Sequence, residues 1–291
     1  MKFPKVSGVI LFILITITSC KNATNSAKGN TEEHPKKERI ISLNGTLTEI
    51  ISAVSHQDQL VAVDVTSTYP ESVKENATDL GHVRNLSVEA ILQEKPTQIF
   101  ALKNDLSEDL TSKLNNLNIP IHYYQTEYSA KGAKELIKKV AADLGEETPK
   151  EVTETIDSEL QNLATFKNEP RVLFVYARGA GTLLVAGKTT PVAKMIALSG
   201  GKNAIDSFDD YRPLTTEAVA KANPDVLLFF KSGLQSVGGL QGVKKIQGLA
   251  ETEAAKKEQI IAMDGLLLTS FGPRTGKAAN ILNSKLNSYA K

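Results

Sequence analysis

The sequence predicts an α/β protein of two doubly wound, Rossmann-like lobes, joined by a single long helix and with a ligand cleft between the lobes. Along the chain, short β-branched runs alternate with segments of helical apolar spacing, the order typical of parallel sheets with crossover helices. A block of similar sequence occurs twice, and one amphipathic segment lies between the two copies. Two related lobes around one cleft suit the binding of a ligand.

The repeated block reads LSVEAILQEKPTQIFAL at residues 86–102 and LTTEAVAKANPDVLLFF at residues 214–230. Leu, Glu, Ala and Pro occupy the same relative places in both copies. The distance between the copies is the size of a whole domain, about 100–150 residues, whereas a solenoid repeat has roughly 20–50. We therefore expect one lobe at residues 39–147 and a second at residues 170–291.

Residues 1–19 are expected to be a lipoprotein signal peptide. Lysines precede an apolar run at residues 9–17, and small residues lead into Cys20, the only cysteine. The run is shorter than the roughly 20 apolar residues of a membrane span. The sequence ITSC at residues 17–20 resembles a bacterial lipobox, whose cysteine becomes the lipidated first residue. An ordinary signal peptide with an incidental cysteine is the alternative.

Residues 20–38 are expected to be a flexible tether from the lipidated Cys20, because they offer almost nothing to bury, and His34 is then a solvated tail residue. The formal net charge of +1 and the lack of a basic stripe argue against a nucleic-acid partner. What remains of the chain is long enough for two domains with real cores.

In the first lobe, residues 39–43 form the first expected strand, which ends at Asn44-Gly45. Residues 46–55 have helical spacing, with Thr46 as the expected N-cap and Glu49 in the capping-box position. The further expected strands are residues 60–65, 98–101 and 121–124, and the further helices are residues 87–93, 107–117 and 130–144.

The second lobe repeats this order. Its expected strands are residues 171–176, 226–230 and 259–263, and its expected helices are residues 190–199, 215–222 and 275–289. The connecting helix is assigned to residues 148–169, within which residues 148–166 place Val152, Ile156 and Leu160 on one apolar face. A helix of about 19 residues would run roughly 28 Å. One rigid helix as the link is expected to allow only modest opening and closing.

Five segments carry a family resemblance: RIISLNGTLTEI (39–50), VDVTSTYP (63–70), LGHVRNLSVEAI (80–91), LSGGKNAIDSFDDYRPLTTEA (198–218) and AMDGLLLTSFGPRT (262–275). With these segments, the whole mature chain resembles class III periplasmic substrate-binding proteins, and within them the haemin-binding branch. The resemblance implies a lipid-anchored protein of the periplasm or cell envelope that is a monomer. It also implies haem as the transported ligand, delivery to an ABC permease dimer with its ATPase, and no catalytic cofactor.

The resemblance places the haem-ligating tyrosine in the STYP segment, at Tyr69. Phenolate is a hard anionic donor that suits ferric iron. The phenol of free tyrosine has a pKa near 10, so ligation needs the metal charge and a nearby cation to favour loss of the proton. Arg84 is the candidate for that cation. The alternative is that Tyr69 packs its loop beside Pro70.

A second axial ligand is less defined. Some haemin-binding relatives have a histidine in the glycine-rich turn after the first strand of the second lobe, where this chain has Arg178. Tyr176, just before this turn, could supply a second oxygen ligand or pack at the strand end. His82 in LGHVRN is expected to be either a ligand or part of the pocket wall.

Haem also carries two propionates and a large apolar face. Arg178, Arg212 and Arg274 are the candidates for the propionates, because guanidinium binds carboxylate with two parallel hydrogen bonds. The aromatic residues Phe208, Tyr211 and Phe271 are candidates to stack on the porphyrin. Surface ion pairs worth about 0–1 kcal/mol would be the simpler reading of these arginines.

Glu89 and Glu217 occupy equivalent places in the repeated block, each in the first turn of an expected helix. A carboxylate there is favourable in itself, so helix capping explains the pair without a function. In the related importers the corresponding pair meets arginines on two permease subunits, and two equivalent charges match a two-fold symmetric partner. The resemblance therefore implies permease docking, which is compatible with capping.

Other functions stay open as alternatives. The sequence has no GxSxG, HExxH or CxxC motif, and the glycines of the stretch from Gly181 to Gly187 are one residue too far apart for a phosphate-binding loop, so an α/β enzyme is the remote alternative. A ferric siderophore or cobalamin is the nearer one. A zinc or manganese ion is disfavoured by the few scattered histidines.

Overall fold

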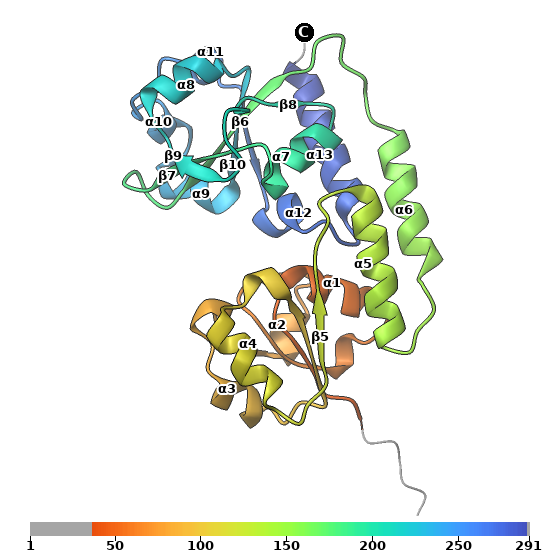
Figure 1. The fold of residues 1–291 in the computed structure, drawn as a ribbon. Helices are drawn as coiled ribbons and strands as arrows, with labels where there is room; N and C mark the ends of the chain where they lie inside the picture. Colours follow the sequence, from red (N-terminus) through yellow and green to blue (C-terminus); the bar gives the residue numbers. More distant parts are fainter. Residues whose placement is uncertain (1–36, 290–291) are drawn as a thin grey trace, which may run out of the picture. The chain divides into compact units, whose positions relative to one another are not determined.

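The computed structural model describes residues 37–289, and the predicted signal peptide, Cys20 and His34 lie outside this range. Two separate sheets are each covered by helices on both faces, so the predicted α/β class with two lobes is confirmed (Figure 1). Within residues 37–289, no helix has the length and apolar character needed to cross a membrane.

The N-terminal lobe is built on five strands in the order β3-β2-β1-β4-β5, and all neighbouring pairs are parallel. Its strands are β1 (Ile40–Ser42), β2 (Leu60–Val63), β3 (Thr78–Asp79), β4 (Gln98–Leu102) and β5 (Ile121–Tyr124). Its helices are α1 (Gly45–Ala53), α2 (Val73–Asn76), α3 (Val88–Gln93), α4 (Glu108–Asn115) and α5 (Ala130–Asp143), with short 3₁₀ turns η1 (Gln57–Gln59), η2 (Val83–Asn85) and η3 (Lys103–Asp105).

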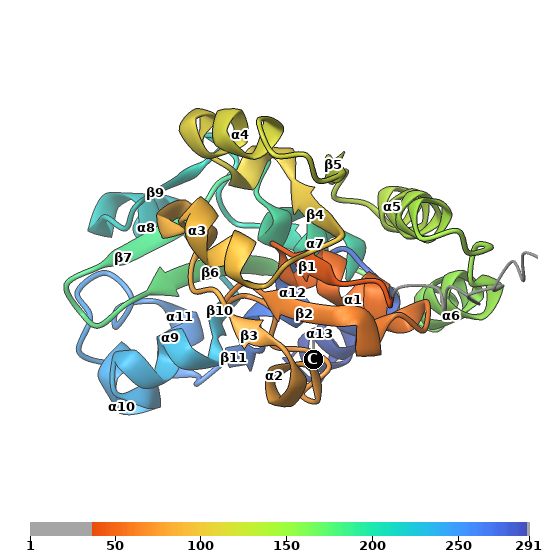
Figure 2. The ribbon, with the colours of Figure 1, turned by 90° about the horizontal axis from the view of Figure 1, so that it is seen from below.

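Side chains alternate between the two faces of this sheet, as the period of a β-strand requires. Ile40 and Phe100 pack with α1 and α5 on one face, whereas Ile41 and Ile99 pack with α3 and α4 on the other (Figure 2). All four are fully buried. Burial on both faces explains why these strands read as nearly continuous apolar runs.

The C-terminal lobe has the strand order β11-β10-β6-β7-β9, with β8 paired to β6. Its strands are β6 (Arg171–Ala177), β7 (Leu183–Ala186), β8 (Lys202–Asn203), β9 (Tyr211–Pro213), β10 (Val226–Phe230) and β11 (Ile260–Met263). Its helices are α7 (Pro191–Leu198), α8 (Thr216–Ala222), α9 (Lys231–Ser236), α10 (Gly239–Val243), α11 (Glu253–Lys256), α12 (Gly265–Thr269) and α13 (Thr275–Tyr289). Helices α7, α12 and α13 cover one face, and α8, α10 and α11 the other.

The strands that were expected in this lobe, β6, β10 and β11, pair in parallel as the sequence predicts. Strands β7 and β9 were not expected, and they pair antiparallel. After β6 the chain turns back within residues 178–182, where the Arg178 N–H donates to the Thr182 carbonyl at 3.0 Å. So short a connection cannot hold a crossover helix, and it therefore returns the chain as an antiparallel neighbour.

The connecting helix α6 (Lys150–Gln161) has 12 residues and is shorter than the expected span of residues 148–166. Pro149 directly precedes the helix. Because a proline disfavours helical geometry in the residue before it, Thr148 stays outside α6. At the other end, the Asn283 side chain from α13 accepts from the Ala164 N–H at 2.9 Å and donates to its carbonyl at 2.8 Å. These bonds hold the chain after α6 in a non-helical path against α13.

Helix α6 also lies close against α13 along its own length. Gly276 permits this approach, because a Cβ there would lie 2.7 Å from the Ile156 carbonyl oxygen. Ile156 itself is fully buried with the core of the N-terminal lobe. The link between the lobes is therefore packed on both of them.

The described chain begins slightly before the expected end of the tether. Lys37 Nζ lies 3.1 Å from Asp58 Oδ2, and Glu38 accepts hydrogen bonds from Thr97 and Gln98. Both residues thus contact the N-terminal lobe.

Candidate ligand-binding site

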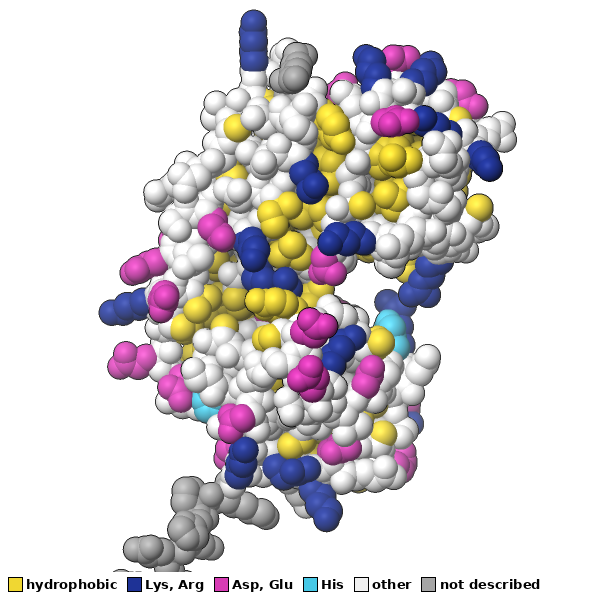
Figure 3. Space-filling model, turned by 180° about the vertical axis from the view of Figure 1, so that it is seen from behind, with side chains coloured by type: hydrophobic (Ala, Val, Ile, Leu, Met, Phe, Trp, Pro, Cys, Tyr) yellow, Lys and Arg dark blue, Asp and Glu magenta, His cyan; other side chains and the backbone are white. Residues whose placement is uncertain are grey.

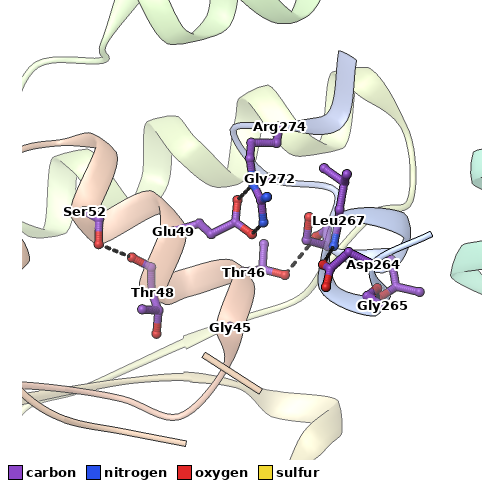
Figure 4. A network of polar contacts seen from close by, with 12 residues as sticks. Gly45, Thr46, Thr48, Glu49, Ser52, Asp264, Gly265, Leu267, Gly272 and Arg274 are labelled. Carbon is purple, nitrogen blue, oxygen red and sulfur yellow. Dashed lines mark hydrogen bonds and ion pairs between the residues drawn. The ribbon is translucent and has the colours of Figure 1, made fainter. Parts of the chain in front are cut away.

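Helix α1 is capped two residues earlier than expected, because Asn44 and not Thr46 is the N-cap. Asn44 Oδ1 accepts from the backbone N–H groups of Thr46 at 2.8 Å and Leu47 at 3.4 Å. The side chains of Thr46 and Glu49 are consequently not used for capping. Figure 4 shows both of them directed at the segment around α12 and the start of α13 in the C-terminal lobe.

Glu49 and Arg274 form a two-pronged ion pair between the lobes. Arg274 Nε donates to Glu49 Oε2 at 2.8 Å, and a second guanidinium nitrogen contacts Oε1. Glu49 is 2% exposed, and the side chain of Arg274 keeps 16% of its surface accessible. Beside this pair, Thr46 Oγ1 donates to the Ser270 carbonyl at 2.9 Å (Figure 4).

Burial and pairing act in opposite directions on this ion pair. Burial raises the pKa of Glu49, and the hydrogen bond and charge of Arg274 partly oppose that rise. For Arg274, burial lowers the pKa, but the bond and charge of Glu49 outweigh this effect and raise it. A buried charge is tolerable only when it is paired and hydrogen-bonded, which each partner provides for the other.

Tyr69 lies against the same guanidinium. The Cζ atom of Arg274 is 3.6 Å from the centroid of the Tyr69 ring, well within the range of a cation–π contact. Tyr69 remains 43% exposed. The cation that the structure brings to Tyr69 is thus Arg274 from the other lobe. The expected cation, Arg84, is exposed in η2 and acts instead on Asp105. Burial raises the pKa of Asp105, and the charge of Arg84 partly offsets that rise.

Asp64, the residue directly after β2, holds the loop that carries Tyr69 in place by hydrogen bonds. This carboxylate is 3% exposed and accepts hydrogen bonds from the Thr66 hydroxyl at 2.7 Å and the Ser67 hydroxyl at 2.9 Å. Thr66 Oγ1 in turn accepts from the Gly45 N–H at 2.9 Å, which ties the loop to α1. Burial raises the pKa of Asp64, and these hydroxyl bonds partly offset the rise.

In the C-terminal lobe, Tyr176, Leu184, Tyr211 and Phe230 line an apolar cavity of about 260 Å³. Tyr176 meets Phe230 edge-on with centroids 6.0 Å apart, and Tyr211 at 6.5 Å. Burial first, and then the nearby phenol of Tyr128, raise the pKa of Tyr211 to about 12, although a hydrogen bond with Thr190 lowers it. Tyr211 is therefore a neutral phenol at pH 7.

Tyr128, which sequence reasoning missed, lies between β5 and α5 of the N-terminal lobe and contacts the C-terminal lobe. Its ring packs on Phe271 of the C-terminal lobe, with centroids 5.5 Å apart. Phe271 is fully buried, so it supports this contact from the core and offers no free face for stacking.

The other predicted residues lie on the surface around these groups. Arg178 Cζ is 5.8 Å from the Tyr176 ring centroid, and Arg212 Cζ is 4.7 Å from that of Phe208. His82 Nδ1 accepts from the Arg84 N–H at 3.2 Å, which caps η2. Among residues 37–289, no group of three or more His, Cys, Asp or Glu side chains is placed to hold a metal ion.

Glu89 and Glu217 are both exposed in the first turns of α3 and α8. The predicted N-caps are confirmed: Ser87 accepts from the Ala90 N–H at 3.2 Å and Thr215 from the Ala218 N–H at 3.1 Å. Neither glutamate makes the capping bond itself, so both carboxylates face solvent at helix N-termini.

Glu49, Asp64 and Tyr128 were not among the expected site residues. A clue to the two acids was present in the sequence, since each carboxylate directly adjoins β-branched apolar residues, in TEII and AVDV. Buried acids of this kind are rare without a partner. Their partners come from distant segments, which one sequence does not reveal.

Comparisons with known proteins agree on the family. Residues 40–266 match the family model described as periplasmic binding protein. The solved structure of the periplasmic heme-binding protein RhuT from Roseiflexus sp. RS-1 in apo form has a TM-score of 0.82 and 35% sequence identity, covering 88% of this chain and 100% of that chain. Periplasmic heme-binding protein BhuT in complex with two hemes has a TM-score of 0.82 and 29% identity, with 87% and 99% covered. The vitamin B12-binding protein of Yersinia pestis (strain Pestoides F) is 28% identical over 239 residues, which are 80% of this chain and 78% of that protein.

The ion pair between the lobes leads to a prediction for stability. Replacing Glu49 by Ala leaves the guanidinium of Arg274 mostly buried and without a counter-charge, so the free energy of unfolding should fall by about 3 kcal/mol. Urea denaturation at neutral pH measures this loss. The double variant Glu49→Met with Arg274→Met should be more stable than Glu49→Ala, because it leaves no unpaired charge.

Asp109→Ala is the matched control, since it breaks the exposed pair with Lys113 and should cost at most about 1 kcal/mol. The effects of substituting Glu49 alone, Arg274 alone and both together on the free energy of unfolding should not be additive. Additive effects would show that the two residues do not act as one unit.

Proposed function

This chain belongs to the periplasmic binding protein family, and we propose that it is the substrate-binding protein of an ABC importer, which captures haem between its lobes and passes it to the permease. The contact of Tyr69 with Arg274 carries this proposal. It presents an exposed phenol, the oxygen donor that suits ferric iron, on a loop fixed to both lobes.

The two lobes supply different parts of a haem site. Tyr69 comes from the N-terminal lobe, while the rings of Tyr176 and Tyr211 in the C-terminal lobe offer apolar surface to a porphyrin. Arg84, Arg178 and Arg212 are exposed and could bind propionates, and Figure 3 shows basic side chains at the edge of a hollow in the surface. Arg274 is already paired with Glu49, so we assign it to Tyr69 and not to a propionate.

Cobalamin is the second candidate, and it is favoured by one observation, the similarity to the vitamin B12-binding protein of Yersinia pestis. A ferric siderophore remains a third within the same group of importers. Haem is preferred because the two solved structures named above, which are 35% and 29% identical to this chain, are described as heme-binding.

For delivery, we propose that Glu89 and Glu217 dock on the permease dimer. Both are solvent-exposed, and they occupy equivalent places in the two lobes. Two equivalent charges fit a partner with two-fold symmetry.

For localisation, we propose that Cys20 carries a lipid that anchors the protein in the cell envelope. The support is the lipobox-like sequence ITSC after a short apolar run. A lipid anchor would hold the protein at the membrane near the permease without a spanning helix.

Haem binding is tested by titrating the purified protein with haemin. The Soret band should shift at micromolar haemin, with the charge-transfer bands of tyrosinate-ligated ferric haem. Tyr69→Phe removes the donor oxygen, so these bands should vanish and the affinity should fall at least about tenfold, the loss seen even for groups that only support a metal ligand. Tyr123→Phe, which removes a phenol bonded to Asn115 in the same lobe, should leave both unchanged. An unaltered spectrum in Tyr69→Phe would contradict the assignment.

Docking predicts a loss of transport without a loss of binding. Replacing both Glu89 and Glu217 by Lys should abolish haem uptake by cells, while the haem affinity of the purified protein stays the same. The charge-matched control is Glu151→Lys with Glu154→Lys on α6, both exposed and outside the repeated block. Normal uptake by the Glu89 and Glu217 variant would rule out this docking mode.

Anchoring predicts that Cys20→Ala releases the protein from membranes. After cell fractionation, the wild-type chain should sediment with membranes and require detergent for extraction, whereas Cys20→Ala should be in the soluble fraction with unchanged haem affinity. Membrane retention of the variant would show that Cys20 is not the anchor.

A further inference from the structure

The apolar cavity of the C-terminal lobe is too small for a whole cofactor. Its volume is about 260 Å³, and none of its lining residues, Tyr176, Leu184, Tyr211 and Phe230, carries a charge at neutral pH. Pockets that enclose a complete small ligand have about 300–1,000 Å³. An apolar cavity of about 150 Å³ holds a benzene ring. This cavity therefore fits one apolar edge of a larger ligand.

The wall of the cavity is built from aromatic rings that pack against one another. Phe174, which is fully buried, lies behind it, with its ring centroid 4.8 Å from that of Phe230 and 6.4 Å from that of Tyr211. Tyr176 meets Phe230 edge-on at an interplanar angle of 89°. Aromatic rings fixed against each other in this way select a ligand edge by shape, because they need no rearrangement to receive it.

The cavity adjoins the segment that also reaches the Tyr69 site. A Cβ on Gly265, the first residue of α12, would lie 3.7 Å from the Phe230 ring. The next residue, Leu266, approaches α1 so closely that a Cβ on Gly45 would lie 2.7 Å from its Cδ1. The first two residues of α12 thus lie beside the cavity wall and beside the first residue of α1, the helix that carries Glu49.

Haem and cobalamin differ at the edge that such a cavity would meet. The haem ring has vinyl and methyl groups along one edge and its two propionates along the opposite edge. The corrin ring of cobalamin carries amide side chains around its rim. Burying vinyl groups is favourable, whereas burying an amide without a hydrogen-bond partner is costly.

We propose that the cavity lined by Tyr176, Leu184, Tyr211 and Phe230 receives the vinyl-bearing edge of haem and is the element that selects haem over cobalamin. This inference rests on the proposed haem-binding function. It also orients the ligand, because the propionates must then point away from the cavity, toward the exposed arginines.

The test compares ferric porphyrins that differ only at the two vinyl positions: haem, mesohaem with ethyl groups, deuterohaem with hydrogens and haematohaem with hydroxyethyl groups. Iron and propionates are the same in all four, so coordination by Tyr69 is held constant. Mesohaem should bind within about threefold of haem, whereas deuterohaem and haematohaem should bind at least about tenfold more weakly. Cobalamin should bind more weakly than any of the four.

Leu184→Asn places an amide in the cavity wall at nearly constant volume. It should reduce the preference for haem over haematohaem about tenfold. The control is Leu240→Asn, at a leucine of the same lobe that is 39% exposed and outside the cavity, and it should keep the preference. If Leu184→Asn does not fold, Leu184→Ala removes part of the wall and should narrow the difference between haem and deuterohaem.

The outcomes separate this inference from the proposed function. Equal affinities for haem, deuterohaem and haematohaem would overturn the role of the cavity and leave haem binding intact, as would an unchanged preference in the folded Leu184 variant. Tight binding of cobalamin with no binding of any porphyrin would overturn the proposed function and the inference together.

Discussion

The ion pair of Glu49 and Arg274 is the constraint on which the arrangement of the site depends. It joins α1 of one lobe to the start of α13 in the other, and it sets the guanidinium against the Tyr69 ring. Asn44 makes this possible by taking over the cap of α1, which leaves Glu49 for the pair. A charge pair so well shielded from water has a strict geometry, because a small displacement costs hydrogen bonds that nothing else replaces.

The parts of the two lobes that we propose face the ligand are unlike, although the lobes share a repeated block. The N-terminal lobe contributes Tyr69 on a loop held by buried hydroxyls and Asp64, whereas the C-terminal lobe contributes a wall of packed aromatic rings. The antiparallel strands β7 and β9 make this difference, because they bring Leu184 and Tyr211 beside the end of β6. The repeat is retained in α3 and α8, where Glu89 and Glu217 stand in equivalent first turns.

Sequence reasoning predicted well what depends on local pattern. Strands β5 and β10 and helix α13 have the predicted bounds, because apolar period and flanking prolines define them. Sequence reasoning failed where contacts with distant segments determine the structure. Helix α6 is shorter than predicted, because the hydrogen bonds of Asn283 hold the chain after it in a non-helical path. Strand β7 was not predicted, because it forms by pairing antiparallel with β6. For the site, the STYP segment could direct attention to Tyr69, but the approach of Arg274 follows from tertiary structure alone. The binding and docking roles of all the predicted residues, Tyr69 included, stay predictions.

The placement of Arg274 has a consequence for the cycle of capture and release. The guanidinium of Arg274 both joins the lobes through Glu49 and packs against the ring of Tyr69, the candidate iron ligand. Any movement that separates Glu49 from Arg274 also removes the cation from the Tyr69 ring. In the proposed haem site, the lobes therefore cannot separate at this point without weakening the hold of Tyr69 on the iron. A permease that pulls the lobes apart would thereby loosen the cargo with the same motion, and unloading would need no separate trigger.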